Sequence, residues 1–279
     1  MIGLDPIYLE SVVRCALDED LGSGDVTTLL TVPQSNDSSA VIIAHEPGVA
    51  AGLPVAQAVF EALDSGIVFD AAVADGEEVG ADTIMAKITG TTRTILSGER
   101  VALNFLQRMS GIATLTRAFV AETADTRARI VDTRKTTPGL RRLEKYSVAV
   151  GGGSNHRFGL GDGILIKDNH IASAGGITSA LAAARKSAPH NLRIEIEVSS
   201  LNQLEQALDG GADAVLLDNM EPELMQQAVE MVAGRAVLEA SGGITLQNAA
   251  AVAKSGVDLI SVGALTHSVK ALDISLDIQ

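Results

Sequence analysis

Residues 192–219, LRIEIEVSSLNQLEQALDGGADAVLLDN, contain a complete strand–helix–strand unit, and this unit decides the fold of the second half of the chain. LRIEIEV alternates apolar and charged residues as a strand does, and AVLLDN begins with the short apolar run of a buried strand. Between them, LNQLEQAL places apolar residues at helical spacing, and a Gly-Gly pair ends the helix. Strands joined through a helix in this way lie parallel in one sheet.

The same rhythm continues on both sides of this unit, from about residue 129 onward. Short apolar runs predict six strands: ARIVDT, GILIKD, LRIEIEV, AVLLDN, AVLEAS and LISVGA. Helical stretches alternate with them, which predicts a mostly parallel sheet, either open or closed into a barrel. A full barrel of this kind has eight strands, and no dinucleotide fingerprint follows the first strand. We therefore expect an incomplete α/β barrel.

The first part of the chain has a different texture. A helix is expected over residues 5–19, and another in PVAQAVFEAL. Alternating runs in SAVIIAH, IVFDAAV and TIMAKITG, separated by turn signals such as DGEEVGAD, predict an antiparallel sheet. SGERVALNFLQRMSGIATLTRAFVAET is expected to be helical, with Gly111 as a possible break.

A basic island interrupts an acidic chain. The protein has 21 Lys and Arg against 35 Asp and Glu, yet residues 132–170 hold seven cations and four acids. Cations concentrated among glycines and beside His156 and His170 favour a pocket for a small polyanionic molecule. A nucleic-acid surface would more often make the whole domain basic. A solvated basic face is the alternative reading.

Composition excludes several other classes. The single cysteine, Cys15, excludes an intrachain disulfide framework and a Cys-based zinc site. An isoelectric point of about 4.7 argues against general affinity for nucleic acid or anionic membranes. No apolar run approaches the roughly 18 residues of a membrane span. The first residues, MIGLDPIYLE, lack the pattern of a signal peptide, so we expect a soluble cytoplasmic protein.

The predicted strand ends carry polar residues six times in succession. Barrel enzymes place their working side chains where strands end and the following loops begin. Six polar ends that alternate cations, acids and glycines therefore predict a functional site. The ends are Asp132–Lys135, Lys167–Asp168, Glu195 with Glu197, Asp218–Asn219, Ser241–Gly243 and Ser261–Gly263.

Strand alternation in IEIEV puts Glu195 and Glu197 on one face and the apolar residues on the other. With the apolar face toward the helices, both acids point into the barrel. Buried carboxylates need a cation, a metal or a substrate charge nearby, and Lys167 is a plausible partner. For Glu195, an ion pair that fills the bottom of the barrel is an equally good reading.

Other strand ends suit phosphate and metal chemistry. Asp218 would be the second acid at the top of the barrel, beside Glu197. Two such carboxylates can hold Mg²⁺ together with phosphate oxygens, or stabilise a developing sugar oxocarbenium ion. The glycines of SGGI (241–244) and SVGA (261–264) let backbone N–H groups approach a phosphate. Tight turns are the alternative for these glycines. The roles of His170 and His267 stay undecided.

Other reaction types are less well supported. No GxSxG turn is present, which argues against acyl transfer. Lys167 is at a predicted strand end, and neighbouring cations would depress its pKa, as Schiff-base chemistry requires. The same cations also suit simple anion binding, so both readings stay open.

Several segments together resemble the quinolinate phosphoribosyltransferase family over nearly the whole chain, in order. The resemblance implies an N-terminal α/β sandwich domain with an antiparallel sheet at residues 1–114. It also implies an incomplete α/β barrel of about seven strands at residues 115–267, with a C-terminal tail, 268–279, packed back on the first domain. The segments are EDLGSGDVTT (19–28), SGERVALNFLQRMSGIAT (97–114), DTRKTTPGLR (132–141), GGGSNHRFGLGDGILIKDNHI (151–171), EIEVSSL (195–201), LLDNM (216–220), SGGI and SVGALTH.

The resemblance also implies an activity. Family members transfer phosphoribosyl from phosphoribosyl pyrophosphate to quinolinate with decarboxylation, giving nicotinate mononucleotide, pyrophosphate and CO₂ in de novo NAD biosynthesis. A homologous transferase acting on another substrate, a Schiff-base lyase using Lys167 and a catalytically silent metabolite-binding protein are the alternatives. The resemblance further implies Mg²⁺ or Mn²⁺ as cofactor and a homodimer in which Arg100 serves the partner's site.

The implied site residues fall into three groups. Quinolinate's carboxylates are expected to contact cations, the ribose and the metal to contact acids, and the 5′-phosphate to contact the glycine turns. Lys135, Lys167, Glu197 and Asp218 are expected to be catalytic. The groups are Arg100, Thr133, Arg134, Lys135, His156, Arg157 and Lys167 for quinolinate, Glu197 and Asp218 for ribose and metal, and Ser241, Gly242, Gly243, Ser261, Val262 and Gly263 for phosphate.

Overall fold

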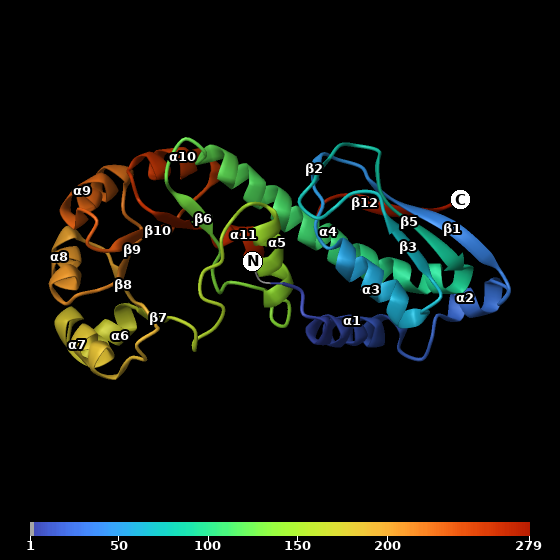
Figure 1. The fold of residues 1–279 in the computed structure, drawn as a ribbon, viewed down its shortest axis with the longest axis horizontal. Coiled ribbons are helices and arrows are strands. Elements are labelled where there is room, and N and C mark those ends of the chain that lie inside the picture. Colours follow the sequence, from blue (N-terminus) through green and yellow to red (C-terminus); the bar gives the residue numbers. More distant parts are fainter. Residues whose placement is uncertain (1–2) are drawn as a thin grey trace. The chain divides into compact units, whose positions relative to one another are not determined.

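The computed structural model describes residues 3–279 (Figure 1). Two compact units divide the chain between them. The first contains the residues up to Arg117 together with Thr136–Gly152 and Leu265–Gln279, and the second contains Ala118–Lys135 and Gly153–Ala264. Neither unit is continuous in sequence, and the C-terminal residues belong to the first unit.

The first unit is built on a four-stranded antiparallel sheet in the order β12-β1-β5-β3. Strand β12 comes from the C-terminal end of the chain and pairs with β1, from Ala40 opposite Ile278 to Ala44 opposite Ile274. The predicted antiparallel sheet is therefore confirmed. Its strands are β1 (Asp37–Ala44), β3 (Val68–Ala71), β5 (Thr83–Thr91) and β12 (Ile274–Ile278), and a separate two-stranded ladder joins β2 (Gly48–Val49) to β4 (Glu78–Val79).

The helices of the first unit have ordinary local causes. Asp5 caps α1 (Pro6–Leu21) by accepting the Ile7 N–H, and Pro6 occupies the first turn. Helix α4 (Thr92–Glu122), which continues into the second unit, runs without interruption through Gly111. A Cβ at Gly111 would collide with the Lys270 carbonyl oxygen, so this glycine allows close packing and is not the break considered from sequence. The others are α2 (Val26–Thr31), α3 (Leu53–Leu63) and α5 (Arg141–Val150).

The second unit contains one parallel sheet. Its six strands follow the order β6-β11-β10-β9-β8-β7, which confirms the predicted parallel α/β architecture. Edge strands β6 and β7 are not paired with each other within the described residues, so the barrel is incomplete. A single parallel bridge between Val131 and Ser154 stands where a seventh strand would lie. The strands are β6 (Arg129–Val131), β7 (Ile164–Ile166), β8 (Ile194–Val198), β9 (Ala214–Asp218), β10 (Val237–Ser241) and β11 (Leu259–Ser261).

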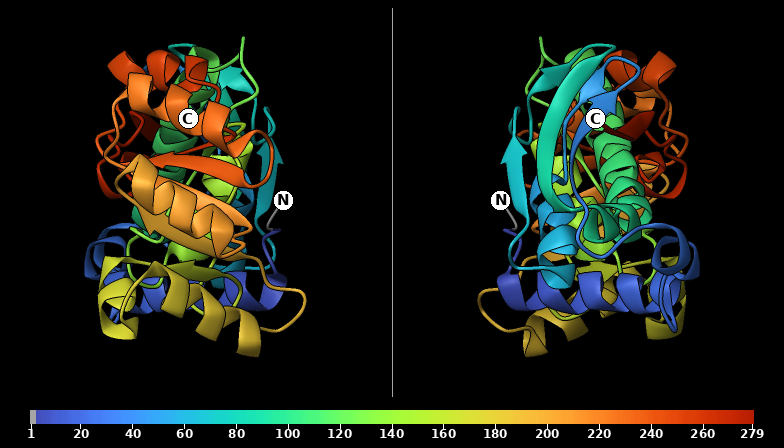
Figure 2. Two further views of the ribbon diagram at one scale, coloured as in Figure 1. Left: turned by 90° about the vertical axis from the view of Figure 1, so that its left-hand side faces the viewer. Right: turned by 90° about the vertical axis from the view of Figure 1, so that its right-hand side faces the viewer.

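Helices cover the outer face of this sheet (Figures 1 and 2). Ile194, Ile196 and Val198 of β8 are buried, while Glu195 and Glu197 of the same strand line cavities inside the barrel. In residues 3–279, no helix combines the length and apolar character needed to cross a membrane. The helices are α6 (Asp168–Ala174), α7 (Ile177–Ser187), α8 (Leu201–Asp209), α9 (Pro222–Val232), α10 (Leu246–Lys254) and α11 (Ala264–His267).

Candidate active site

A cavity of about 560 Å³ lies at the carboxyl ends of the barrel strands. Parallel strands bring their carboxyl ends to one edge, so residues far apart in sequence meet there. The lining combines cations, acids and glycines, as the strand-end pattern predicts. The lining residues are Thr133, Arg134, Lys135, His156, Arg157, Leu165, Lys167, Glu197, Leu216, Asp218, Asn219, Glu239, Ser241, Gly242, Gly243 and Ser261.

Asp132 ties the two cationic segments of the site together. Its carboxylate is fully buried and accepts the His156 backbone N–H at 2.8 Å and the Asn155 side-chain amide at 2.7 Å. Thr133 Oγ1 accepts the Lys135 N–H at 3.0 Å and shapes the loop that follows β6. Asp132 therefore acts on the site by holding the 155–157 loop beside the 133–135 loop.

Five cationic side chains line this one cavity: Arg134, Lys135, His156, Arg157 and Lys167. Arg157 is held by a 2.9 Å hydrogen bond to the Gly163 carbonyl oxygen. Burial, together with the charge of Arg134, lowers the pKa of Arg157. Guanidinium groups bind carboxylates and phosphates through paired hydrogen bonds, so the cavity suits a polyanionic ligand.

The seven cations of residues 132–170 do not all lie in one pocket, so the interpretation of this segment as a single basic island is wrong. Arg141, Arg142 and Lys145 belong to the first unit, in helix α5. Arg141 donates to Thr136 Oγ1, and Arg142 lies over the Tyr8 ring at 4.9 Å. A helix inserted between β6 and the 153–157 loop thus divides the cations between two units, which a count of charges cannot show.

A buried charge cluster forms the floor of the cavity. His156 Nε2 lies 3.2 Å from a Glu195 oxygen and 3.3 Å from a Glu239 oxygen. Burial lowers the pKa of His156, but hydrogen bonds to Glu195 and Glu239 and their charges outweigh burial and raise it to about 10. The ion-pair reading of Glu195 agrees with this geometry.

Glu239 was missed in the choice of site residues. Its side chain is only 1% exposed, and burial raises its pKa, as does the charge of Glu195, while His156 and Ser261 lower it. A sequence signal did exist, because Glu239 is an acid in the middle of the apolar strand AVLEAS. A charged residue at such a position needs a buried partner, as Glu195 does on β8.

The acids at the upper end of the cavity have different neighbours. Lys167 Nζ lies 3.4 Å from Glu197 Oε2, so Lys167 pairs with Glu197 rather than with Glu195. Asp218 Oδ2 accepts the Asn219 side-chain amide at 2.9 Å. Oxygen ligands of this kind on two neighbouring strands match the preference of Mg²⁺ and Mn²⁺.

The glycine turn after β10 depends on backbone geometry. Gly242 and Gly243 have φ values of +88° and +63°, which favour glycine, and Asn219 has a φ of 52°. A Cβ on Gly242 would collide with the Asn219 side-chain oxygen. The turn therefore exposes backbone beside Ser241 that a larger residue would cover.

Three of the expected site residues do not line this cavity. Arg100 is an exposed residue of α4 in the first unit, 3.8 Å from Glu99. Val262 is buried and donates its N–H to the Val131 carbonyl oxygen, and Gly263 follows it.

The two undecided histidines have local hydrogen bonds. His170 accepts the Lys167 N–H at the start of α6, and His267 lies 2.6 Å from Ser268 Oγ. Each is therefore engaged with a neighbour in its own turn of the chain.

The fold and the cavity together define a class of protein. An incomplete parallel α/β barrel with cations, acids and glycine turns at its strand ends is an enzyme architecture for phosphorylated, anionic small molecules. The family models for the N-terminal and C-terminal domains of quinolinate phosphoribosyl transferase match residues 25–110 and 112–277. The chain belongs to the quinolinate phosphoribosyl transferase family.

Individual relatives are similar to this chain over nearly the whole length of both proteins. A Bacillus subtilis (strain 168) protein named probable nicotinate-nucleotide pyrophosphorylase (carboxylating) is 45% identical, over 99% of this chain and 95% of that protein. The Mycobacterium leprae (strain TN) nicotinate-nucleotide pyrophosphorylase (carboxylating) is 46% identical, over 95% of each chain. The crystal structure of NadC from Streptococcus pyogenes superposes with a TM-score of 0.96 at 42% identity, covering 99% of this chain and 98% of that one.

Proposed function

We propose that this family member transfers the phosphoribosyl group of phosphoribosyl pyrophosphate to quinolinate and releases pyrophosphate and CO₂. The observation that carries the proposal is a single cavity lined by five cations, three acids and a glycine turn. Two carboxylates and three phosphate groups on the substrates require this excess of positive charge. The product is nicotinate mononucleotide, a precursor of NAD.

The residues act by binding, orientation and electrostatics. Arg134, Lys135, His156, Arg157 and Lys167 hold the two carboxylates of quinolinate, so that the pyridine nitrogen faces C1 of the ribose. The C1–O bond to pyrophosphate breaks as the nitrogen–C1 bond forms. The resulting pyridinium accepts the electron pair of the breaking C–CO₂ bond, and the ring carbon then takes up a proton.

Glu197 and Asp218 face the ribose in this proposal and stabilise positive charge that develops at C1. The turn at Ser241–Gly243, with Ser261, Val262 and Gly263 on the next strand end, binds the 5′-phosphate. Phosphate fits such turns because their backbone N–H groups are accessible.

Glu197 and Asp218 would also hold Mg²⁺ or Mn²⁺, because both carboxylates line the same cavity and hard cations prefer oxygen ligands. A bound divalent ion supplies positive charge that neutralises the pyrophosphate leaving group. Lys167 beside Glu197 supplies part of the same neutralisation from the chain itself.

The assembly and location belong to the same proposal. We expect a cytoplasmic homodimer in which Arg100 of each chain acts at the partner's site. Arg100 is exposed on α4, and among residues 3–279 its one ion pair is the 3.8 Å contact with Glu99, so its guanidinium is accessible to another molecule.

A direct assay tests the proposed activity. Purified protein is incubated with phosphoribosyl pyrophosphate and either quinolinate or nicotinate, and release of pyrophosphate and CO₂ is followed. Quinolinate should be consumed, and nicotinate should be turned over at least about 100-fold less efficiently, because cations built for a second carboxylate would be left without a partner. Equal turnover of nicotinate, or trapping of substrate on Lys167 by borohydride, would contradict the proposal.

A further inference from the structure

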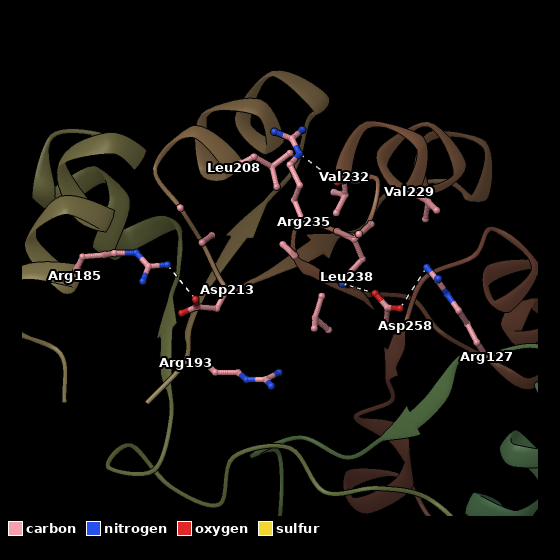
Figure 3. A pocket seen from close by; sticks show the side chains of 15 residues that line it. Arg127, Arg185, Arg193, Leu208, Asp213, Val229, Val232, Arg235, Leu238 and Asp258 are labelled. Carbon is pink, nitrogen blue, oxygen red and sulfur yellow. Dashed lines mark hydrogen bonds and ion pairs between the residues drawn. The ribbon is translucent and has the colours of Figure 1, made fainter. Parts of the chain in front are cut away.

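A second cavity, of about 610 Å³, opens at the amino ends of the barrel strands and shares no lining residue with the candidate active site (Figure 3). Four arginines lie around it: Arg127, Arg185, Arg193 and Arg235. Two acids, Asp213 and Asp258, are the only carboxylates of the described chain among its lining residues. The sequence alone does not predict this second concentration of cations, because the four arginines are dispersed over 109 positions.

Both carboxylates are already neutralised. Asp213 accepts the Ile194 N–H with one oxygen and the Arg185 guanidinium, at 3.0 Å, with the other. Asp258 accepts the Leu238 N–H in the same way and pairs with Arg127 at 3.3 Å. Each acid therefore joins two strand starts and forms an ion pair with one arginine, whereas Arg193 acts on Asp213 only through its charge and Arg235 has no carboxylate partner in the described residues.

Arg235 has a structural role that also orients it. Its Nε and Nη2 donate to the Val232 and Met231 carbonyl oxygens at the end of α9, where cations offset the helix dipole. A guanidinium has five N–H donors, so several stay available after these two bonds. A pre-oriented arginine loses little side-chain entropy on binding an anion.

Arg193 has no such role. Within residues 3–279 its side chain makes no hydrogen bond or ion pair and acts on Asp213 only through its charge, and it lies between Asp213 and Asp258 (Figure 3). It immediately precedes β8 and shares a strand face with Glu195 and Glu197, so it enters the same barrel from the opposite end. A lone arginine directed across a concave, positively charged surface is what an anion-binding site presents.

The rest of the lining is apolar. Leu208 and Val229 form a partly exposed wall beside the arginines, whereas Val232 and Leu238 of the same lining are buried (Figure 3). The volume lies within the roughly 300–1,000 Å³ of small-molecule sites. An inorganic ion would contact the arginines but not the apolar residues. A phosphorylated organic molecule would contact both the arginines and the apolar residues.

From these contacts we propose that the amino-terminal mouth of the barrel binds a phosphorylated small molecule of nucleotide size. Its phosphate pairs with Arg193, and its organic part reaches toward Arg235 and packs on Leu208 and Val229. None of its residues takes part in the proposed reaction, although Arg193 also lines a neighbouring cavity with His156 and Arg157.

Calorimetric titration with adenosine 5′-monophosphate and with inorganic phosphate tests the proposal. Arg193→Gln removes the charge without breaking a described hydrogen bond or ion pair, and we expect it to weaken binding of the nucleotide at least about tenfold. Arg129→Gln is the matched control, because Arg129 is an exposed arginine at the start of β6 that does not line the cavity. Arg193→Lys should restore part of the affinity.

A Lys135→Ala variant separates the two cavities, since Lys135 lines only the candidate active site. Nucleotide binding that survives Lys135→Ala and weakens in Arg193→Gln supports the proposal. It is overturned by loss of binding in Lys135→Ala alone, by equal weakening in Arg129→Gln, or by no saturable binding up to about 5 mM nucleotide. Equal affinity for phosphate and nucleotide would overturn the role of the apolar wall.

Discussion

The imidazole Nε2 of His156 lies 3.3 Å from a carboxylate oxygen of Glu239, so an acid buried inside strand β10 holds one of the cations of the proposed quinolinate site. Glu195 reaches the same nitrogen at 3.2 Å. Because the folded-state pKa of His156, about 10, is above its ordinary value of 6.5, the contribution of its imidazolium to stability is fully present below pH 6.5 as long as the two carboxylates are ionised. That stabilisation is lost as the pH rises through about 10.

Glu239→Gln should weaken quinolinate binding. Glutamine keeps the shape of the side chain but removes a charge that favours the imidazolium, so the pKa of His156 falls. We expect KM for quinolinate to rise about tenfold at pH 8 with a smaller change in kcat, and the alkaline loss of activity to move to lower pH. Steady-state kinetics between pH 6 and 10 measure both effects.

Glu230→Gln is the control for this change, because Glu230 is exposed on α9. A purely structural role for Glu239 would lower thermal stability while leaving KM and the pH profile where they are in the wild type. That outcome would contradict the assignment.

The periodicity of the sequence predicts the six parallel strands and their polar ends, because alternation and helical spacing are local properties. The meeting of Arg134, Lys167 and Asp218 in one cavity follows from that topology. Glu239 was not predicted, because strand AVLEAS is mostly apolar. The arginine cavity was not predicted, because three of its arginines precede strands and Arg185 lies in helix α7, so none follows a strand end. Helix α5 was not predicted, because its segment was interpreted by its cations and not by the helical spacing of its apolar residues.

Gly242→Ala should impair binding of phosphoribosyl pyrophosphate. A Cβ at this position would collide with Asn219 Oδ1, and the φ of +88° is strained for any L side chain. We expect KM for phosphoribosyl pyrophosphate to rise by more than about tenfold and stability to fall by about 1–3 kcal/mol. Kinetics and thermal melts are the measurements. Gly161→Ala, where a Cβ meets nothing within 4 Å, should behave as wild type, and an unaltered Gly242→Ala enzyme would remove the turn from the phosphate site.

Asp218→Asn should weaken the dependence of activity on Mg²⁺ or Mn²⁺, or raise the metal concentration needed for half-maximal rate by about tenfold or more. The reason is that one of two candidate carboxylate ligands loses its charge. Titrations of metal against initial rate compare this variant with Asp209→Asn, an exposed acid at the end of α8. Full turnover of the wild type in excess EDTA would rule out a required divalent ion.

Arg100 provides a test of the proposed dimer by subunit mixing. Arg100→Ala and Lys167→Ala homodimers should each be nearly inactive, since one lacks the residue donated to the partner and the other lacks a residue of the receiving barrel. Both variants should fold, because Arg100 and Lys167 are exposed and each makes one long ion pair, at 3.8 Å and 3.4 Å.

Refolding the two variants together makes the prediction quantitative. Random association gives about half mixed dimers, and a two-fold dimer has two equivalent sites. If Arg100 acts across the dimer, one site of each mixed dimer receives both defects and the other receives neither. Roughly a quarter of the wild-type activity should therefore return. If Arg100 acted within its own subunit, every site would keep one defect, and mixing would restore nothing. Native mass spectrometry confirms that mixed dimers have formed, so their presence without recovered activity would refute the shared site.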